Sequence, residues 1–118
     1  MGYDSTIKTA KGELKMSIFN LFNRGSKFSE GIETARKTAG AVLLDVRTKE
    51  EYKAGHVPGA VNLPLDSLHS AKLDKSKPLF VYCLSGARSS RACSYLKDQG
   101  YETTNIGGIS SYSGDLER

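Results

Sequence analysis

The chain has little of what would mark several common classes of protein. Its 118 residues include only two cysteines and two histidines, too few for a disulfide framework or for a zinc site of the usual spacing. No segment approaches the roughly 18 consecutive apolar residues of a membrane-spanning helix. Repeats and low-complexity tracts are also absent. We therefore expect no metal site and no membrane span, and the scarcity of cysteine favours a reducing, cytoplasmic setting.

The composition that remains is that of one ordinary globular domain. Hydrophobic residues make up 38% and charged residues 25% of the chain, which is typical of globular domains, and the length fits a single domain. The net charge is +4, but lysine and arginine are spread along the chain rather than clustered. This charge suits a small anionic substrate and does not predict binding to nucleic acid.

The N-terminal stretch differs from the rest. Residues 1–15 are polar and lack the periodicity of a helix or strand, and Met16 then begins an apolar motif. We expect residues 1–15 to be an expression leader and disordered. Residues 16–27 form a short apolar segment, of which Ile18–Phe22 is predicted to dock on the domain; contact with a partner or a membrane is the alternative. The domain itself is expected to span residues 28–118.

Helix and strand signals alternate along that domain. Apolar residues at helical spacing predict a helix over 28–38, and Thr48 and Glu51 form a capping box for a helix over 49–54. Strands are expected at 41–44, 60–63, 79–82 and 101–106, with a short helix or turn at 65–73 and a helix at 87–99. This order predicts an α/β fold with a mostly parallel central sheet and helices on both faces.

Cys83 ends one of these strands and opens a loop of sequence Cys-Leu-Ser-Gly-Ala-Arg-Ser-Ser before a helix. The N–H groups of such a loop and the helix N-terminus point toward the sulfur, and Arg88 adds a positive charge. We therefore expect a thiol of lowered pKa in a cradle that binds a small oxyanion. Gly86 is expected to supply a positive φ. The alternative is a buried strand-end cysteine without reactivity.

Four motifs in order resemble the signatures of the rhodanese (sulfurtransferase) family. They are Leu43–Arg47 with Glu50–Tyr52, Gly55–Pro64, Cys83–Ser89 and Asn105–Ile109. The resemblance runs from about Phe28 to near the C-terminus. It implies a single rhodanese-like domain with Cys83 as catalytic nucleophile. It also implies a substrate-binding loop made of Leu84, Ser85, Gly86, Ala87, Arg88 and Ser89.

The activity implied by this resemblance is sulfur transfer without a cofactor. Thiosulfate, a persulfide or a polysulfide would load Cys83, and the Cys83 persulfide would pass its outer sulfur to a thiol acceptor, a sulfur carrier or cyanide. The alternative is a non-catalytic rhodanese-like module that binds a regulatory partner. Four residues separate Cys83 from Arg88, whereas cysteine phosphatases place five there. The shorter loop is too tight for a tetrahedral phosphate, so phosphatase activity is disfavoured.

Four polar residues outside the loop are interpreted as structural support. Asp45 and Arg47 resemble the family's Asp-x-Arg and are expected to tie a strand end to the loop, with direct catalysis as the alternative. Glu51 is expected to pair with Arg47 at i, i+4. His56 lies in a Gly-His-x-Pro-Gly turn, where a structural hydrogen bond is expected rather than a role as general base.

The second cysteine is expected to have no part in the chemistry. Cys93 shares one face of the 87–99 helix with Ser89, Ala92 and Leu96, because these residues follow helical spacing. It is therefore predicted to pack in the core as a small apolar side chain. The alternative is a redox partnership with Cys83.

Overall fold

Helices and strands alternate along residues 27–118, which are the residues that this computed structural model describes. In chain order they are α3 (Lys27–Lys37), β2 (Val42–Asp45), α4 (Lys49–Ala54), β3 (Val61–Asn62), η2 (Leu65–Ser70), β4 (Leu79–Cys83), α5 (Ala87–Asp98), β5 (Thr103–Gly108) and η3 (Ile109–Ser111). Every expected element is present: α4 has the expected bounds, and the other elements differ from them by one or more residues at one or both ends. The first six residues of the 65–73 segment form the 3₁₀ helix η2. The expectations for residues 1–15 and for Ile18–Phe22 fall outside the described residues.

The four strands form one parallel sheet in the order β3-β2-β4-β5. From β2 the chain runs to β3 on one side, and it later enters the sheet again at β4 on the other side of β2. The strand order therefore reverses direction between β2 and β4. Asp45 at the end of β2 lies opposite Tyr82 in β4. The carboxyl ends of these two strands therefore meet at one edge of the sheet, which is where ligands bind in sheets of this kind.

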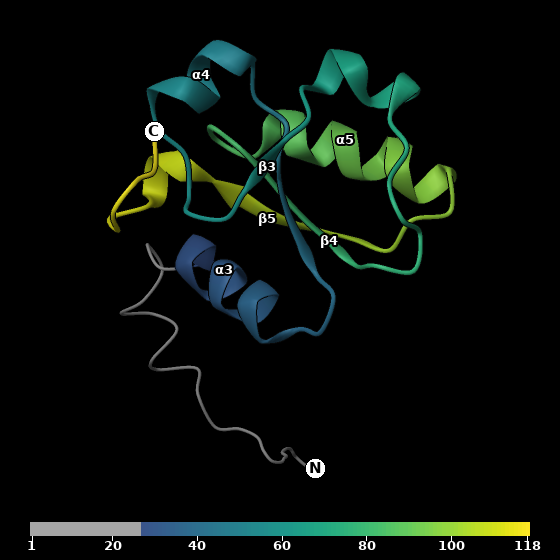
Figure 1. The fold of residues 1–118 in the computed structure, drawn as a ribbon, viewed down its shortest axis with the longest axis horizontal. Helices are drawn as coiled ribbons and strands as arrows, with labels where there is room; N and C mark the ends of the chain where they lie inside the picture. Colours follow the sequence, from purple (N-terminus) through teal and green to yellow (C-terminus); the bar gives the residue numbers. More distant parts are fainter. Residues whose placement is uncertain (1–26) are drawn as a thin grey trace.

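Helices cover both faces of the sheet, as predicted (Figure 1). On one face, α3 presents Phe28, Ile32 and Ala35 to the sheet side chains Leu43, Phe80, Tyr82 and Ile106. On the other face, Ala92, Cys93 and Leu96 of α5 pack against Leu44, Val81 and other residues of β2 and β4. A buried parallel sheet needs such near-continuous apolar strands, and all five residues of β4 are buried.

Across residues 27–118, no helix is long and apolar enough to cross a membrane.

The prediction for Cys93 is confirmed as far as packing is concerned. Its side chain is buried in the α5 core together with Ala92 and Leu96, and burial raises the pKa of its thiol. A buried thiol that favours the protonated form is a poor nucleophile.

Replacing this side chain tests its packing role. Cys93→Ala should lower the free energy of unfolding by about 1–2 kcal/mol because it removes a buried sulfur and leaves a small cavity. Urea denaturation measures the change. Ser94→Ala, an exposed position on the same helix, is the control and should change stability little. A Cys93→Ala protein as stable as the parent would show that the sulfur contributes nothing to the core.

Candidate active site

The Cys83 loop joins β4 to α5 at the shared edge of the sheet. Gly86 precedes the helix with φ 107° and ψ −13°, a left-handed conformation that favours glycine, as expected from the sequence. Behind the loop, β5 approaches so closely that a Cβ on Gly108 would collide with the carbonyl of Leu84. The same carbonyl accepts a hydrogen bond from the Ser110 N–H at 3.1 Å. Gly108 and Ser110 of the C-terminal segment therefore pack against the loop at Leu84 and fix its position.

Two donors approach the sulfur of Cys83 directly. The Gly86 N–H lies 3.0 Å from Sγ and the Ser89 hydroxyl 3.5 Å from it. Burial alone would raise the pKa of the thiol, but hydrogen bonds from the Ser89 hydroxyl and from the Ser89, Gly86 and Ser85 N–H groups lower it below its ordinary value. Hydrogen bonds to the charged form stabilise a thiolate. The expected direction is thus found, with hydrogen bonds as the main cause.

The remaining loop residues differ in exposure. Leu84, Ser85 and Ala87 are exposed, Gly86 and Arg88 are half-buried, and Ser89 is fully buried. Cys83 itself is only 1% exposed.

Asn105 supports this loop and was not recognised from the sequence as a site residue. Its side-chain oxygen accepts from the Ser89 hydroxyl at 2.7 Å, so it competes with the Cys83 sulfur for the one hydroxyl proton. The same oxygen accepts the Gly107 N–H at 3.0 Å, and the side-chain nitrogen donates to the Gly86 carbonyl at 3.3 Å. The β4–β5 register shifts between Val81 and Tyr82. The Asn-Ile-Gly-Gly sequence carries the signal for such an irregularity, because glycine inside a strand often marks a bulge.

Arg88 is held by Glu51 rather than left open to an anion. Its two terminal nitrogens lie 2.7 and 3.0 Å from the two Glu51 oxygens, a bidentate geometry. The hydrogen bond from Arg88 lowers the pKa of Glu51 to about 2, and Glu51 in turn raises the pKa of Arg88. The guanidinium fork is therefore occupied by a carboxylate of α4.

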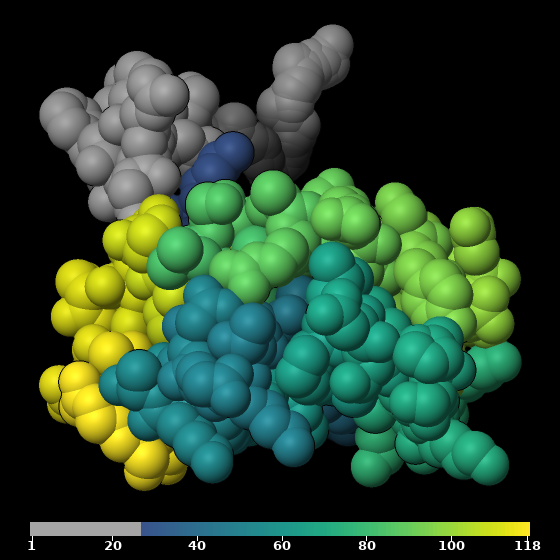
Figure 2. All heavy atoms as spheres, turned by 90° about the horizontal axis from the view of Figure 1, so that it is seen from above, coloured from purple at the N-terminus to yellow at the C-terminus, as the bar shows by residue number. Residues whose placement is uncertain are grey.

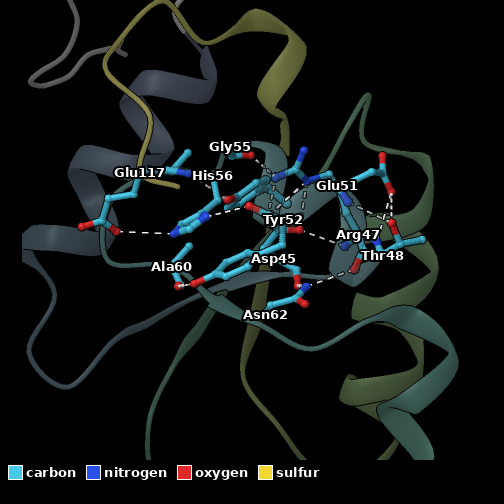
Figure 3. A network of polar contacts seen from close by, with 12 residues as sticks. Asp45, Arg47, Thr48, Glu51, Tyr52, Gly55, His56, Ala60, Asn62 and Glu117 are labelled. Carbon is cyan, nitrogen blue, oxygen red and sulfur yellow. Dashed lines mark hydrogen bonds and ion pairs between the residues drawn. The ribbon is translucent and has the colours of Figure 1, made fainter.

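The expected pairing of Glu51 with Arg47 is wrong. Thr48 is the N-cap of α4, and Glu51 is tied to it by the predicted capping box. Arg47 therefore precedes the helix, where the i, i+4 geometry of a helix does not apply. Its guanidinium instead contacts Asp45, with Nη2 and Oδ2 2.7 Å apart, and donates to the Gly55 carbonyl at 2.7 Å. Figure 3 shows this network of polar contacts.

Asp45 and Arg47 lie at the strand end as a buried support. Asp45 is fully buried and Arg47 is nearly so, and both Asp45 oxygens accept from the Arg47 side chain. Asn62 of β3 donates to the carbonyls of both residues at 3.0 Å. The pair thus fixes the α4 turn and β3 to the end of β2. These contacts tie the end of β2 to β3 and to the end of α4 rather than to the Cys83 loop, and the structural role stays a prediction.

His56 belongs to the same support and lies on the side of α4 near the C-terminus. Its ring stacks on Tyr52 with centroids 3.6 Å apart, and Nδ1 lies 2.8 Å from the Tyr52 carbonyl. Its Nε2 lies 3.5 Å from a Glu117 oxygen (Figure 3). The Nδ1 contact is the expected structural hydrogen bond, whereas the Glu117 oxygen pairs with Nε2 only when the ring is protonated, because both partners are acceptors.

Within the described part of the chain, no group of three His, Cys, Asp or Glu side chains is arranged to hold a metal ion.

Comparison with known proteins identifies the family. The family model for the rhodanese-like domain matches residues 28–115. The chain belongs to the rhodanese-like family. This rhodanese-like chain is similar to the "Sulfurtransferase" of Allochromatium vinosum, with 39% identity over 66 residues, which cover 54% of this chain and 62% of that protein. It is also similar to the "Thiosulfate sulfurtransferase GlpE" of Pseudomonas savastanoi pv. phaseolicola, with 41% identity over 69 residues, covering 57% and 65%.

The chain thus spans less than two thirds of the length of either relative. Among solved structures, the rhodanese-like domain protein of Staphylococcus aureus superposes with a TM-score of 0.68 at 28% identity, covering 76% of this chain and 92% of that one. The rhodanese-like fold is therefore established along with the family.

The first prediction for the site concerns Ser89. Ser89→Ala removes the hydroxyl at the sulfur, so the pKa of Cys83 should rise. The rate of iodoacetamide alkylation against pH measures it in a Cys93→Ala background, which leaves one cysteine. Ser90→Ala, at the neighbouring exposed position, is the control and should leave the midpoint unchanged. An unchanged midpoint in Ser89→Ala would show that the hydroxyl does not stabilise the thiolate.

The second concerns acid stability. Because the folded-state pKa of Glu51 is lowered to about 2, its ionised form stabilises the fold above the unfolded value of about 4.3 and loses this effect as pH falls through 2. Glu51→Gln should therefore flatten the loss of unfolding free energy between about pH 5 and pH 2. Denaturation at several pH values measures the slope, with Glu50→Gln as a matched control. Equal slopes in the two variants would contradict the assigned ion pair.

Proposed function

We propose that this rhodanese-like domain is a sulfurtransferase that carries a sulfane sulfur as a Cys83 persulfide. One observation supports the proposal above the others: Cys83 ends β4 with the Gly86 N–H 3.0 Å and the Ser89 hydroxyl 3.5 Å from its sulfur. These donors favour the thiolate, which is the nucleophilic form. The two curated relatives described above are named as sulfurtransferases.

The same hydrogen-bond donors would also stabilise the Cys83 persulfide intermediate. When the thiolate attacks a sulfane sulfur, the negative charge moves to the new outer sulfur, which faces the N–H groups of the loop. Preorganised donors of this kind stabilise charge without reorganising. Transfer between sulfur atoms requires no strong base once the thiolate exists, so the structural placement of His56 agrees with this chemistry.

A second candidate is a non-catalytic module that binds a partner through the same edge of the sheet. The observation that favours it is the burial of Cys83, which is only 1% exposed. If no sulfur donor could reach the Cys83 thiol, the domain would act only by binding a partner.

Intact mass separates the two candidates. Treated with a sulfane-sulfur donor and freed of excess reagent, the parent and Cys93→Ala proteins should each gain the mass of one sulfur, and cyanide should remove it as thiocyanate. Cys83→Ser should gain nothing, because the hydroxyl cannot form a persulfide. If the parent gains no sulfur from any donor while it stays folded, the enzyme proposal fails. If Cys93→Ala loses cyanide turnover, Cys93 is a resolving thiol and not merely a core residue.

A further inference from the structure

The hydroxyl of Ser89 has several acceptors around it and one proton to give. Its oxygen lies 2.7 Å from the Asn105 oxygen and 3.0 Å from the Gly86 carbonyl. The sulfur of Cys83 and the Gly107 carbonyl are each 3.5 Å away. Because the residue is fully buried and a hydroxyl carries a single proton, Ser89 can bond only one of these acceptors well at a time.

The side-chain amide of Asn105 fits its neighbours in one orientation only. Its oxygen accepts the Gly107 N–H at 3.0 Å, and its nitrogen donates to the Gly86 carbonyl at 3.3 Å. A flipped amide would set two donors against each other at Gly107 and two acceptors at Gly86. The atom that faces Ser89 is therefore the amide oxygen. Two oxygens 2.7 Å apart share a proton, and only the Ser89 hydroxyl has one to give.

The sulfur of Cys83 makes opposite demands on Ser89 in its two charge states. A neutral thiol can donate its S–H to the Ser89 oxygen while the hydroxyl proton stays on Asn105. A thiolate can only accept, so it must draw that proton away from Asn105. The Gly86 carbonyl is a weaker rival, because it already accepts the Ser90 N–H at 3.0 Å.

Asn105 acts on the loop from a different element of the fold. It belongs to β5, and its residue is exposed to solvent although Ser89 is not. Figure 2 shows the loop and the start of α5 in green beside the yellow C-terminal segment that follows β5. A substitution of Asn105 therefore changes the acceptor for Ser89 and leaves the sequence of the loop intact.

We propose, building on the sulfur transfer proposed above, that Asn105 is a positioning residue: it holds the Ser89 hydroxyl proton while the Cys83 sulfur is uncharged and yields it when that sulfur becomes an anion. In the proposed cycle the Cys83 sulfur is an anion before it attacks a donor, and again when it gives up the outer sulfur. At both points the Ser89 hydroxyl rotates toward it, and no covalent bond of Ser89 changes.

This exchange makes Asn105 a restraint on the ionisation of Cys83. Each thiolate that takes the Ser89 proton costs the hydrogen bond between Ser89 and Asn105. A thiolate of very low pKa is a weak nucleophile, so a restraint of this kind favours attack on a sulfane sulfur.

The titratable groups on the elements around the sulfur are the same when a neutral residue replaces Asn105. They are Arg88 and Arg91 of α5, Glu51 of α4, Asp45 and Arg47 at the end of β2, Tyr82 of β4, and Asp66 of η2. Of these, Arg88 interacts with the Cys83 thiolate. The strand β5 has no charged side chain between Thr103 and Gly108. A neutral substitution of Asn105 therefore removes no charge from the site.

Asn105→Ser tests the exchange. The serine hydroxyl can still accept the Gly107 N–H, but it is one bond shorter and leaves Ser89 without its acceptor. In a Cys93→Ala background, the pH midpoint of Cys83 alkylation by iodoacetamide should fall by about 0.5 to 1 unit, the scale of one hydrogen bond. Thr104→Ser, at the neighbouring exposed position, is the control and should leave the midpoint unchanged. A midpoint in Asn105→Ser that rises or does not move would overturn the inference.

The same substitution in a Ser89→Ala background separates this exchange from a displaced loop. Without the hydroxyl, Asn105 has no proton to hold, so Asn105→Ser should no longer shift the midpoint. A shift of equal size in both backgrounds would show that Asn105 acts on Cys83 by another route, and the inference would fail.

Asn105→Asp keeps the test decisive if Asn105→Ser does not fold. It preserves the shape of the side chain and the acceptor for Gly107, and its carboxylate holds the Ser89 proton more firmly than an amide does. The midpoint should rise, and it should rise more than in the Ser89→Ala background, where only the added charge acts. An equal rise in the two backgrounds, or a fall, would contradict the role of Asn105.

Sulfur loading distinguishes failure of this inference from failure of the proposed function. Intact mass follows the loading of Cys83 by thiosulfate at several pH values, and its midpoint in Asn105→Ser should move together with that of alkylation. If the parent gains no sulfur from thiosulfate or from cysteine persulfide while the alkylation midpoints shift as stated, the proposed function fails and the hold of Asn105 on Ser89 stands. If sulfur loads but both midpoints are the same in the parent and in Asn105→Ser, this inference fails and the proposed function stands.

Discussion

The two-point contact between Arg88 and Glu51 joins the two strand ends from which the site is built. Arg88 belongs to the first turn of α5, after β4, and Glu51 to the first turn of α4, after β2. The capping box with Thr48 fixes Glu51 before it meets Arg88. This ion pair ties the first turn of α5, next to the Cys83 loop, to α4.

Hydrogen bonds are the main interactions that lower the pKa of the Cys83 thiol, and the thiolate also raises the pKa of Arg88 through the attraction of their charges. The Gly86 N–H and the Ser89 hydroxyl contact the sulfur, and Asn105 holds both residues from β5. Burial opposes ionisation, yet the pKa of Cys83 lies below its ordinary value. A site built this way depends on the rigid placement of a few donors, and the parallel sheet with its two core layers supplies that rigidity.

Sequence patterns that act over short distances predicted the local structure well. The Thr48 capping box, the positive φ of Gly86 and the buried face of Cys93 each depend on neighbours within one or two helical turns. The side-chain contacts of Glu51 and Asn105, in contrast, do not depend on near neighbours in the sequence. Glu51 meets Arg88 37 positions along the chain, and Asn105 meets Ser89 16 positions away. These contacts depend on which strand ends lie side by side in the sheet. The spacing of apolar residues along the sequence does not specify that order.

We infer that short-range hydrogen bonds, more than the positive charge of Arg88, poise Cys83 as a nucleophile. Salt screens the interaction of partly exposed charges but leaves buried hydrogen bonds largely unchanged. The most direct measurement is a titration of the Cys83 thiolate by its ultraviolet absorbance, in the Cys93→Ala protein, at low and at high ionic strength. We expect a midpoint below about 8.5 that hardly moves with salt. A midpoint at or above that value, or one that rises steeply as salt is added, would contradict it.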